Sequence, residues 1–139
     1  MRIYLDSSAL IKRAIDEDCS DPLTDALERV YASGSSVFAS SLAWVEVSRG
    51  MRTRLDAEPP AKIAELSAIA LSAIDRAPIN STVIALARQI GPPGLRLLDA
   101  IHLATASILE ADELWAYDDR LLAAASELGI AVRSPGRPE

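Results

Sequence analysis

The sequence predicts an α/β fold in which one parallel sheet of four to five short strands carries helices on both faces. Two observations support this prediction. Short apolar stretches alternate along the chain with longer amphipathic ones, and alternating strands and helices imply a parallel sheet covered on both faces. The first stretch, Arg2–Asp6, runs from apolar residues into a carboxylate and two serines before a helical pattern begins. That order is typical of a strand-to-helix junction, where ligand sites form in open parallel sheets.

Length and composition indicate a single domain. The chain has 139 residues, enough for a hydrophobic core, and half of them are hydrophobic while only 4% are aromatic. The core is therefore expected to consist of Ala, Leu, Ile and Val. The single cysteine, Cys19, excludes an internal disulfide and suits a reducing compartment. Since no apolar run approaches the ~20 residues of a membrane helix, we expect a cytoplasmic protein without a membrane partner.

The formal net charge of -6 argues against nucleic-acid binding through overall charge. This argument is weak for two reasons. A cluster of acids that holds divalent cations reverses its own local sign, and the basic residues are nearly all arginine, which suits phosphate recognition. Local arrangement therefore decides the matter.

Periodicity and breaker residues predict the order of elements along the chain. The domain is expected to span residues 1–133, and the tail Ser134–Glu139, with two prolines and a glycine, is expected to fray. The expected strands are Arg2–Asp6, Val37–Ala39, Ala77–Ile79, Leu114–Tyr117 and Ile130–Val132, and the expected helices are Ala9–Arg13, Leu23–Ala32, Leu42–Arg54, Pro60–Arg76, Ser81–Ile90, Leu95–Ala106 and Arg120–Leu128.

Four acids occupy related positions in this pattern. Asp6 and Asp118 end apolar strands, while Glu46 and Asp99 lie early in apolar helices where solvated acids are less expected. In a right-handed parallel sheet these positions can converge at the carboxyl edge. Several carboxylates brought together are costly to keep ionised without a counter-cation, and hard oxygen ligands select Mg²⁺ or Mn²⁺. The four acids therefore predict a metal site suited to phosphate chemistry.

Each acid also has a simpler explanation. Asp6 could only cap the following helix, Glu46 could form a surface pair with Arg49, and Asp99 could only stabilise a helix dipole. Of the adjacent acids Asp118 and Asp119, one is enough to cap the helix that follows. The only histidine, His102, is expected to be a packed or hydrogen-bonded core residue.

The motifs YLDSSAL at residues 4–10, Glu46 in the helix after the second strand, LLDAIHLA at 97–104 and AYDDRL at 116–121 resemble those of PIN-domain nucleases. Length and motif order are similar to the VapC toxins of bacterial and archaeal toxin-antitoxin pairs. The resemblance covers the chain to about Val132. Each motif alone is weak, but four motifs in this order are a strong signal.

The resemblance implies a single PIN-like domain that hydrolyses RNA phosphodiesters with one or two Mg²⁺ or Mn²⁺ ions, leaving 5′-phosphate and 3′-hydroxyl ends. Asp6, Asp99 and Asp118 would bind metal, with Glu46 binding directly or through water, and all four would be catalytic. Ser8 and Asp119 would lie next to these ligands, with Ser8 hydrogen-bonding a carboxylate or a metal-bound water. Weaker candidates for contacting the RNA backbone are Lys12, Arg49 and Arg52. The resemblance also implies a structured RNA substrate such as transfer or ribosomal RNA, an antitoxin whose tail inhibits the cleft, and a homodimer.

Other enzyme classes fit poorly. A ribonuclease that uses two histidines is excluded by the single His102, and no Gly-x-Ser-x-Gly elbow or phosphate-cradling glycine loop is present. A receiver domain would place an acidic pair after its first strand and an Asp after its third, where this chain has Asn80. The alternative from another class is a PIN-like module that binds RNA or protein without cutting, and the presence of all four acids argues against it.

Overall fold

The computed structural model describes residues 1–138 and confirms the predicted α/β class. Five strands form one sheet in the order β3-β2-β1-β4-β5, and every neighbouring pair is parallel. The strands are β1 (Arg2–Leu5), β2 (Ser36–Ser40), β3 (Asp75–Ala77), β4 (Glu113–Trp115) and β5 (Ala131–Arg133).

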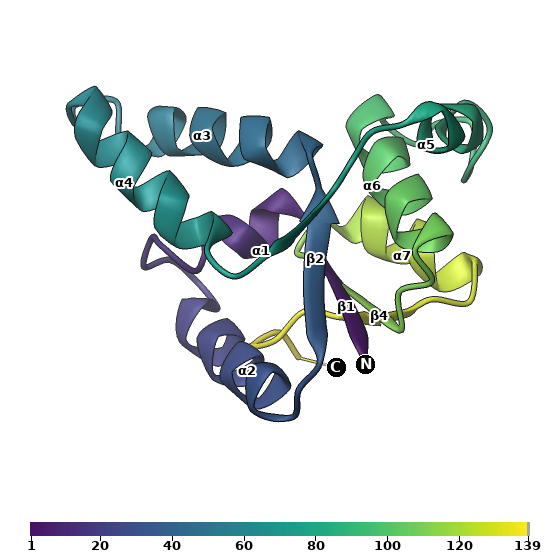
Figure 1. Ribbon diagram of the computed structural model, residues 1–139, viewed down its shortest axis with the longest axis horizontal. Coiled ribbons are helices and arrows are strands. Elements are labelled where there is room, and N and C mark those ends of the chain that lie inside the picture. The colour runs from purple at the N-terminus through teal and green to yellow at the C-terminus, as the bar shows by residue number, and fades with distance from the viewer. Residues whose placement is uncertain (139) are drawn as a thin grey trace.

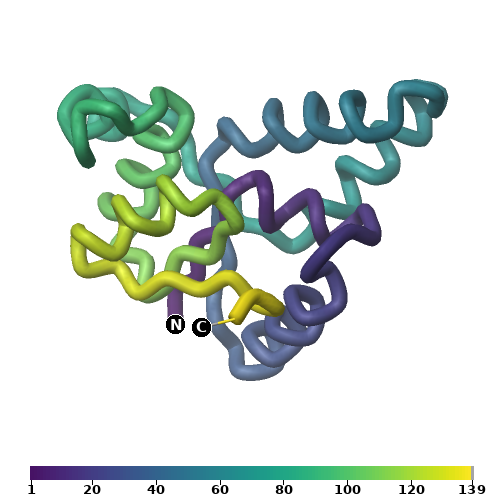
Figure 2. The backbone as a smooth tube through the Cα atoms, turned by 180° about the vertical axis from the view of Figure 1, so that it is seen from behind, coloured from purple at the N-terminus to yellow at the C-terminus, as the bar shows by residue number. Residues whose placement is uncertain are grey.

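Helices cover both faces of the sheet. Helices α1 to α4 lie on one side of it and α5 to α7 on the other, an arrangement that is seen from the front in Figure 1 and from behind in Figure 2. None of the helices in residues 1–138 combines the length and apolar character needed to cross a bilayer. The helices are α1 (Ser7–Ile11), α2 (Ser20–Ala32), α3 (Leu42–Arg54), α4 (Pro60–Leu71), α5 (Ser81–Ala87), α6 (Leu97–Ile108) and α7 (Asp119–Glu127).

Strand β1 shows why the strands read as nearly continuous apolar runs. Ile3 and Leu5 point into the core beneath α1 to α4, whereas Tyr4, between them, points into the core beneath α6 and α7. All three side chains are fully buried. Because successive side chains of a strand point to opposite faces, a central strand covered on both sides needs apolar residues at every position.

The order in which the chain adds strands to the sheet reverses between β1 and β4. The chain adds β2 and β3 on one side of β1 and then returns to add β4 and β5 on the other. The two strands stay joined at their carboxyl ends, where the Asp6 N–H donates to the Trp115 carbonyl oxygen at 3.3 Å. Ligand sites of doubly wound sheets form at this kind of switch point, and Asp6 and Asp118 follow the two strands that define it.

The third strand lies earlier in the chain than predicted. The sequence predicted a helix to Arg76 and a strand at Ala77–Ile79, but α4 ends at Leu71 and β3 is Asp75–Ala77. The prediction of these boundaries was wrong because Asp75 and Arg76 resemble the polar face of a helix. They lie instead on the exposed edge of the sheet, where β3 pairs with β2 in the register Phe38 to Asp75. A turn with Ala73 at φ 59° separates α4 from β3.

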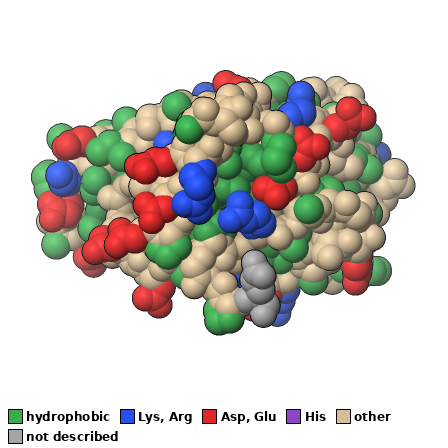
Figure 3. Space-filling model, turned by 90° about the horizontal axis from the view of Figure 1, so that it is seen from below, with side chains coloured by type: hydrophobic (Ala, Val, Ile, Leu, Met, Phe, Trp, Pro, Cys, Tyr) green, Lys and Arg blue, Asp and Glu red, His purple; other side chains and the backbone are tan. Residues whose placement is uncertain are grey.

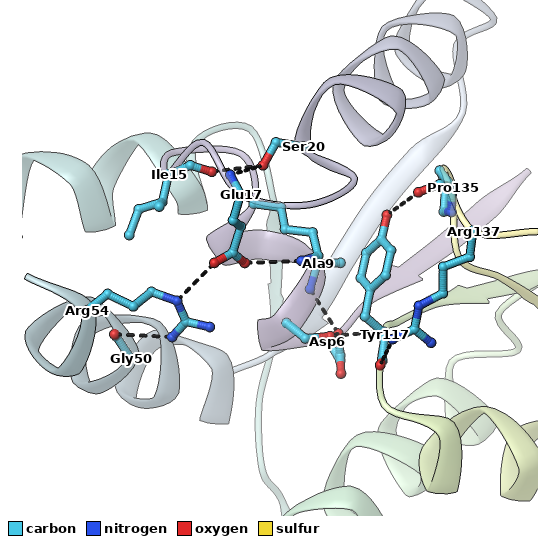
Figure 4. Close-up of polar contacts among 12 residues, drawn as sticks. Asp6, Ala9, Ile15, Glu17, Ser20, Gly50, Arg54, Tyr117, Pro135 and Arg137 are labelled. Atoms are coloured by element: carbon cyan, nitrogen blue, oxygen red, sulfur yellow. Dashed lines mark hydrogen bonds and ion pairs between the residues drawn. The ribbon is translucent and has the colours of Figure 1, made fainter.

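The residues that follow β5 make defined contacts, where the sequence predicted a frayed tail. Ser134 Oγ donates to the Ala116 carbonyl oxygen at 2.7 Å, and the Tyr117 hydroxyl donates to the Pro135 carbonyl oxygen at 2.7 Å. Arg137 donates to the Tyr117 carbonyl oxygen at 2.7 Å and its guanidinium lies over the Tyr117 ring (Figure 4). The tail therefore packs on the segment after β4, while Glu139 lies outside the described residues.

Candidate active site

A cleft of about 400 Å³ opens at the carboxyl ends of β1 and β4 and contains all four acids singled out from the sequence. The acids come from four places in the fold: the junctions β1–α1 and β4–α7, the first half of α3 and the first turn of α6. The residues that line the cleft are Asp6, Ser7, Ser8, Glu46, Arg96, Leu97, Leu98, Asp99, His102 and Asp118.

Asp6 and Asp118 cap helices and face the cleft at the same time. Asp6 Oδ1 accepts the Ala9 N–H of α1 at 3.1 Å, and Asp118 Oδ1 accepts the N–H groups of Arg120 and Leu121 in α7 at 2.9 and 3.1 Å. The Oδ2 atom of each acid receives no hydrogen bond from the described residues. Capping and a role in the cleft, which the sequence presented as alternatives, are therefore compatible because a carboxylate has two oxygens.

Glu46 is held by two donors from other elements. Its Oε1 accepts the Ser7 hydroxyl at 3.2 Å and lies 2.5 Å from His102 Nε2, and its side chain is 20% exposed. The surface ion pair with Arg49 that the sequence left open is not among the ion pairs of the described residues. The expected burial of His102 is confirmed, since it is 2% exposed. The same side chain also lines the cleft, where it contacts Glu46.

Asp99 differs from the other three acids because one of its oxygens is buried without a partner. It lies in the first turn of α6, and within residues 1–138 its Oδ2 has no hydrogen-bond partner. A buried unpaired carboxylate oxygen is costly unless a ligand completes it. Each of the four acids thus has an oxygen that the described protein groups leave without a hydrogen bond.

Two of the acids in the cleft, Asp6 and Asp99, have pKa values above the usual value for aspartate. Burial raises the pKa of Asp6; the charge of Glu46 adds to this effect, while His102 and the hydrogen bonds from Ser8 and Ala9 oppose it. Burial also raises the pKa of Asp99, and the nearby charge of Asp118 raises it further. Such shifts are typical of functional sites, and they mark a place where a cation would relieve repulsion.

The carboxylate oxygens of the cleft are the ligand type that a divalent cation prefers, but they do not form a complete metal cage by themselves. Within the described residues, no three Asp, Glu, His or Cys side chains are grouped closely enough to hold a metal ion by themselves. Mg²⁺ does not need such a cage, because it usually keeps several waters and binds one or two carboxylates together with substrate phosphates. The orphaned Asp99 Oδ2 and the unpaired oxygens of the other acids supply ligands of that type.

Ser8 lies where the sequence reasoning put it, and Asp119 does not line the cleft. Ser8 Oγ donates to Asp6 Oδ1 at 2.6 Å and accepts the Tyr117 N–H at 3.0 Å, so it joins the two strand ends. Asp119 is 90% exposed and pairs with Arg137 at 2.9 Å. It begins α7 one residue after the cap, so its side chain points away from Asp118.

The three cations proposed for RNA contact lie outside the cleft. Lys12 is only 12% exposed, pairs with Glu17 at 3.1 Å and lies 4.6 Å from the Tyr117 ring centre. Glu17 also pairs with Arg54 at 3.2 Å, as Figure 4 shows. Arg49 and Arg52 are exposed and line a separate concavity of about 500 Å³ between α3 and the start of α4.

Sequence reasoning missed several residues of the cleft. Ser7 could have been found, because it lies at the same strand-to-helix junction as Ser8. The contribution of Arg96, Leu97 and Leu98 had no local signal, since it depends on the position of α6. Leu97 and Leu98 are 72% and 45% exposed, which gives the acidic cleft an apolar rim.

The other concave surfaces do not gather acids in this way. The concavity of about 490 Å³ next to the C-terminal tail is lined by a single acid, Asp119. Figure 3 shows the side of the molecule at the amino ends of the strands, where acidic side chains are spread widely with a few Lys and Arg side chains among them. On this face the acids are dispersed, whereas the cleft brings four of them around one cavity.

Comparison with known proteins agrees with this fold and identifies the family. A family model described as the PIN domain matches residues 3–127. Ribonuclease VapC46 of Mycobacterium tuberculosis is 43% identical over 135 residues, covering 96% of this chain and 97% of its own. Ribonuclease VapC47 of the same species is 38% identical over 136 residues, with coverage of 96% and 97%. The chain belongs to the PIN-domain family and, within it, to the VapC ribonucleases.

Two solved structures have the same fold. VapBC2 from Rickettsia felis, bound to a DNA fragment from its promoter, matches with a TM-score of 0.70 at 13% identity and covers 96% of this chain and 98% of that one. Mycobacterium tuberculosis VapC20, a toxin that cleaves the sarcin-ricin loop, matches with a TM-score of 0.67 at 16% identity, covering 88% and 94%. At these identities the likeness concerns the fold.

Proposed function

We propose that this protein is a metal-dependent endoribonuclease and the toxin of a toxin-antitoxin pair. The observation that carries the proposal is the cleft at the β1/β4 switch point, where four carboxylates each keep an oxygen without a described hydrogen-bond partner. The VapC relatives named as ribonucleases support RNA as the substrate. The product ends would be a 5′-phosphate and a 3′-hydroxyl.

Asp6, Glu46, Asp99 and Asp118 would hold one or two Mg²⁺ or Mn²⁺ ions, with Glu46 acting directly or through water. When bound, the ion would lower the pKa of water and stabilise the charge that develops on the phosphate. The protein's own contribution is orientation. The α1 and α7 caps orient Asp6 and Asp118, Ser8 joins the two strand ends, and Leu97 and Leu98 form an apolar rim beside the acids.

The RNA would pass the mouth of the cleft and extend toward the end of α3. Arg96 lines the cleft itself, and Arg49 and Arg52 are exposed further along the same helix as Glu46. Cations in such positions bind phosphates without reading sequence. Replacing Arg49 and Arg52 with alanine should weaken RNA binding and its salt dependence, measured by fluorescence anisotropy, and an unchanged salt slope would remove them from the RNA path.

The substrate would be a structured RNA such as transfer or ribosomal RNA, in keeping with the description of VapC20 as a sarcin-ricin loop cleaving toxin. The VapBC2 complex supports an antitoxin partner for this chain as well. We further propose a homodimer that joins the antitoxin in a larger complex, and a cytoplasmic location.

The test is cleavage of total cellular RNA by purified protein with Mg²⁺ or Mn²⁺. We expect discrete fragments with 5′-phosphate ends for the wild type, and none with a chelator or with Asp99→Asn. The variant controls for contaminating nuclease. If wild type and Asp99→Asn give the same result while the protein still binds Mn²⁺, the chain is instead a PIN module that binds RNA or protein without cutting.

A further inference from the structure

A buried chain of hydrogen bonds runs from β2 to Glu46. The Ser40 N–H donates to the Tyr4 hydroxyl oxygen at 3.2 Å, this hydroxyl lies 2.5 Å from His102 Nδ1, and His102 Nε2 lies 2.5 Å from Glu46 Oε1. Tyr4 is fully buried and His102 is 2% exposed. One polar path therefore links β2, β1, α6 and α3 through a core that is otherwise mostly apolar.

The direction of these bonds follows from the donors available. Because the Ser40 N–H can only donate, the Tyr4 oxygen accepts from it and the phenol hydrogen is left for His102. In the neutral imidazole Nδ1 then accepts, and Nε2 carries the hydrogen that is donated to Glu46.

This arrangement distinguishes the two oxygens of Glu46. Oε1 receives both the His102 Nε2–H and the Ser7 hydroxyl, whereas Oε2 receives no hydrogen bond from the described residues. A glutamate side chain has several rotamers of similar energy, so a fixed pair of donors on one oxygen selects one of them. The selected rotamer leaves Oε2 as the oxygen that Glu46 can present to the cleft.

We propose that His102, held by Tyr4, is a positioning residue that fixes Glu46 so that its Oε2 is offered to a divalent cation in the cleft. The inference rests on the proposed function, because it assigns a task to residues of that same site. Partners of this kind, which orient a ligand without touching the metal, set metal affinity in many proteins.

Packing alone would predict a different behaviour. Tyr4 meets His102 and Phe38 edge to face, with ring centres 5.8 and 5.4 Å apart. If these contacts were the whole role of His102, a leucine of similar bulk would preserve the site and an amide would not. If the Nε2–H bond is the role, glutamine restores it and leucine does not, since the glutamine amide can donate to Glu46.

The first experiment uses the metal-free protein and the fact that the chain has one histidine. The ¹⁵N signals of the neutral imidazole of His102, reached by raising the pH until the signals stop shifting, should show the hydrogen on Nε2. Tyr4→Phe removes the donor to Nδ1 and should shift the Nδ1 signal, because that nitrogen loses its hydrogen bond while Nε2 keeps its bond to Glu46. A hydrogen on Nδ1 in the wild type would overturn the proposal.

The second experiment measures Mn²⁺ binding by calorimetry with the metal alone. His102→Leu should bind Mn²⁺ about 10- to 100-fold more weakly, and His102→Gln should stay within a few-fold of wild type. Thr105→Val is the matched control, because Thr105 is also a buried polar residue of α6 but donates to the Ile101 carbonyl oxygen and not to the cleft. We expect its Mn²⁺ affinity to be unchanged.

The outcomes separate this inference from the proposed function. Equal Mn²⁺ affinity for His102→Leu and wild type, or equal loss for His102→Leu and His102→Gln, overturns the positioning role. If His102→Leu does not fold, Tyr4→Phe decides, since it should weaken Mn²⁺ binding while keeping the ring. Protein that binds Mn²⁺ as expected but cleaves no RNA contradicts the proposed function alone, and wild type that binds no Mn²⁺ overturns both.

Discussion

Asp99 is the acid in the cleft whose ionised form is poorly accommodated by the metal-free protein. One of its oxygens is buried without a partner among the described residues, and burial together with the charge of Asp118 raises its pKa. A group of this kind is expected to serve binding at the expense of stability. His102 and Tyr4, in contrast, satisfy each other's polar atoms in the core, so that the cost of burying them is offset locally.

The stability of Asp99→Asn should therefore exceed that of the wild type at neutral pH in the presence of a chelator. The gain should stay below about 1 kcal/mol, because Asp99 is only part-buried and solvent screens its charge. The folded-state pKa of Asp99 lies above its unfolded value. Its favourable effect on stability is thus fully present below about pH 4 and is lost as pH rises through the folded pKa.

Thermal unfolding across pH measures this prediction. The difference in Tm between Asp99→Asn and wild type should be largest near neutral pH and should shrink as pH falls toward about 4, where the aspartate is also neutral. A difference that grows on acidification would show that Asp99 is stabilised as a carboxylate in the metal-free protein.

At the scale of elements, the junctions β1–α1 and β4–α7 are the parts that build the site. Each places a carboxylate at the N-terminus of a helix after a strand that is buried on both faces: Asp6 directly follows β1, and Asp118 follows β4 after Ala116 and Tyr117. One oxygen caps the helix, which leaves the side chain little rotational freedom, and the other remains for a ligand. A single residue thus orders the local backbone and contributes to the cleft.

Substitutions of Asp118 can separate these two contributions. Asp118→Asn should retain the α7 cap and near wild-type stability, because asparagine caps about as well as aspartate, but it should abolish cleavage by removing the charge. Asp118→Ala should abolish cleavage and also cost about 1 kcal/mol of unfolding free energy in urea.

Asn80→Ala is the matched control for the lost cap. Asn80 Oδ1 caps α5 by accepting the Val83 N–H at 3.0 Å, and it lies outside the cleft. This variant should lose a similar free energy of unfolding while RNA cleavage continues at the wild-type rate. Equal stability of Asp118→Ala and Asp118→Asn would mean that the α7 cap contributes little.

At the scale of the whole molecule, a series of hydrogen bonds links the C-terminal tail to the end of the first strand. Arg137 and Pro135 hold Tyr117, the Tyr117 N–H donates to Ser8, and Ser8 donates to Asp6. Figure 4 shows the Tyr117 side chain extending from the neighbourhood of Asp6 toward Pro135. Residues from the two ends of the chain therefore share the support of one carboxylate.

Removal of residues 134–139 should lower both stability and activity. The truncated protein loses several hydrogen bonds of about 1 kcal/mol each, partly exposed, so a loss of about 1–2 kcal/mol is expected in urea unfolding. Cleavage should also fall, because Tyr117 and Ser8 lose support. Removal of residues 138–139 alone is the control and should leave both unchanged; if the longer truncation is as active and stable as the full chain, the tail does not support the site.

The fold class and the set of four acids can both be predicted from local sequence pattern. Strands buried on both faces must be apolar throughout, and helices packed on one face must be amphipathic, so the α/β order is visible in local pattern. The four acids interrupt that pattern at the strand ends and in early helix turns, which made them conspicuous. The predicted boundaries were wrong at β3, because the polar residues of this edge strand resemble the exposed surface of a helix.

The contacts that hold the acids depend on the folded arrangement and could not be predicted from the sequence. His102 meets Glu46 across 56 residues and Tyr4 across 98, and Ser8 meets Tyr117 across 109. Sequence spacing contains no information on such pairs, because their distance depends on where the sheet places α3, α6 and β4 relative to β1. The same reason explains why Lys12 is occupied by Glu17 and Tyr117, why Asp119 faces Arg137, and why the tail is bound.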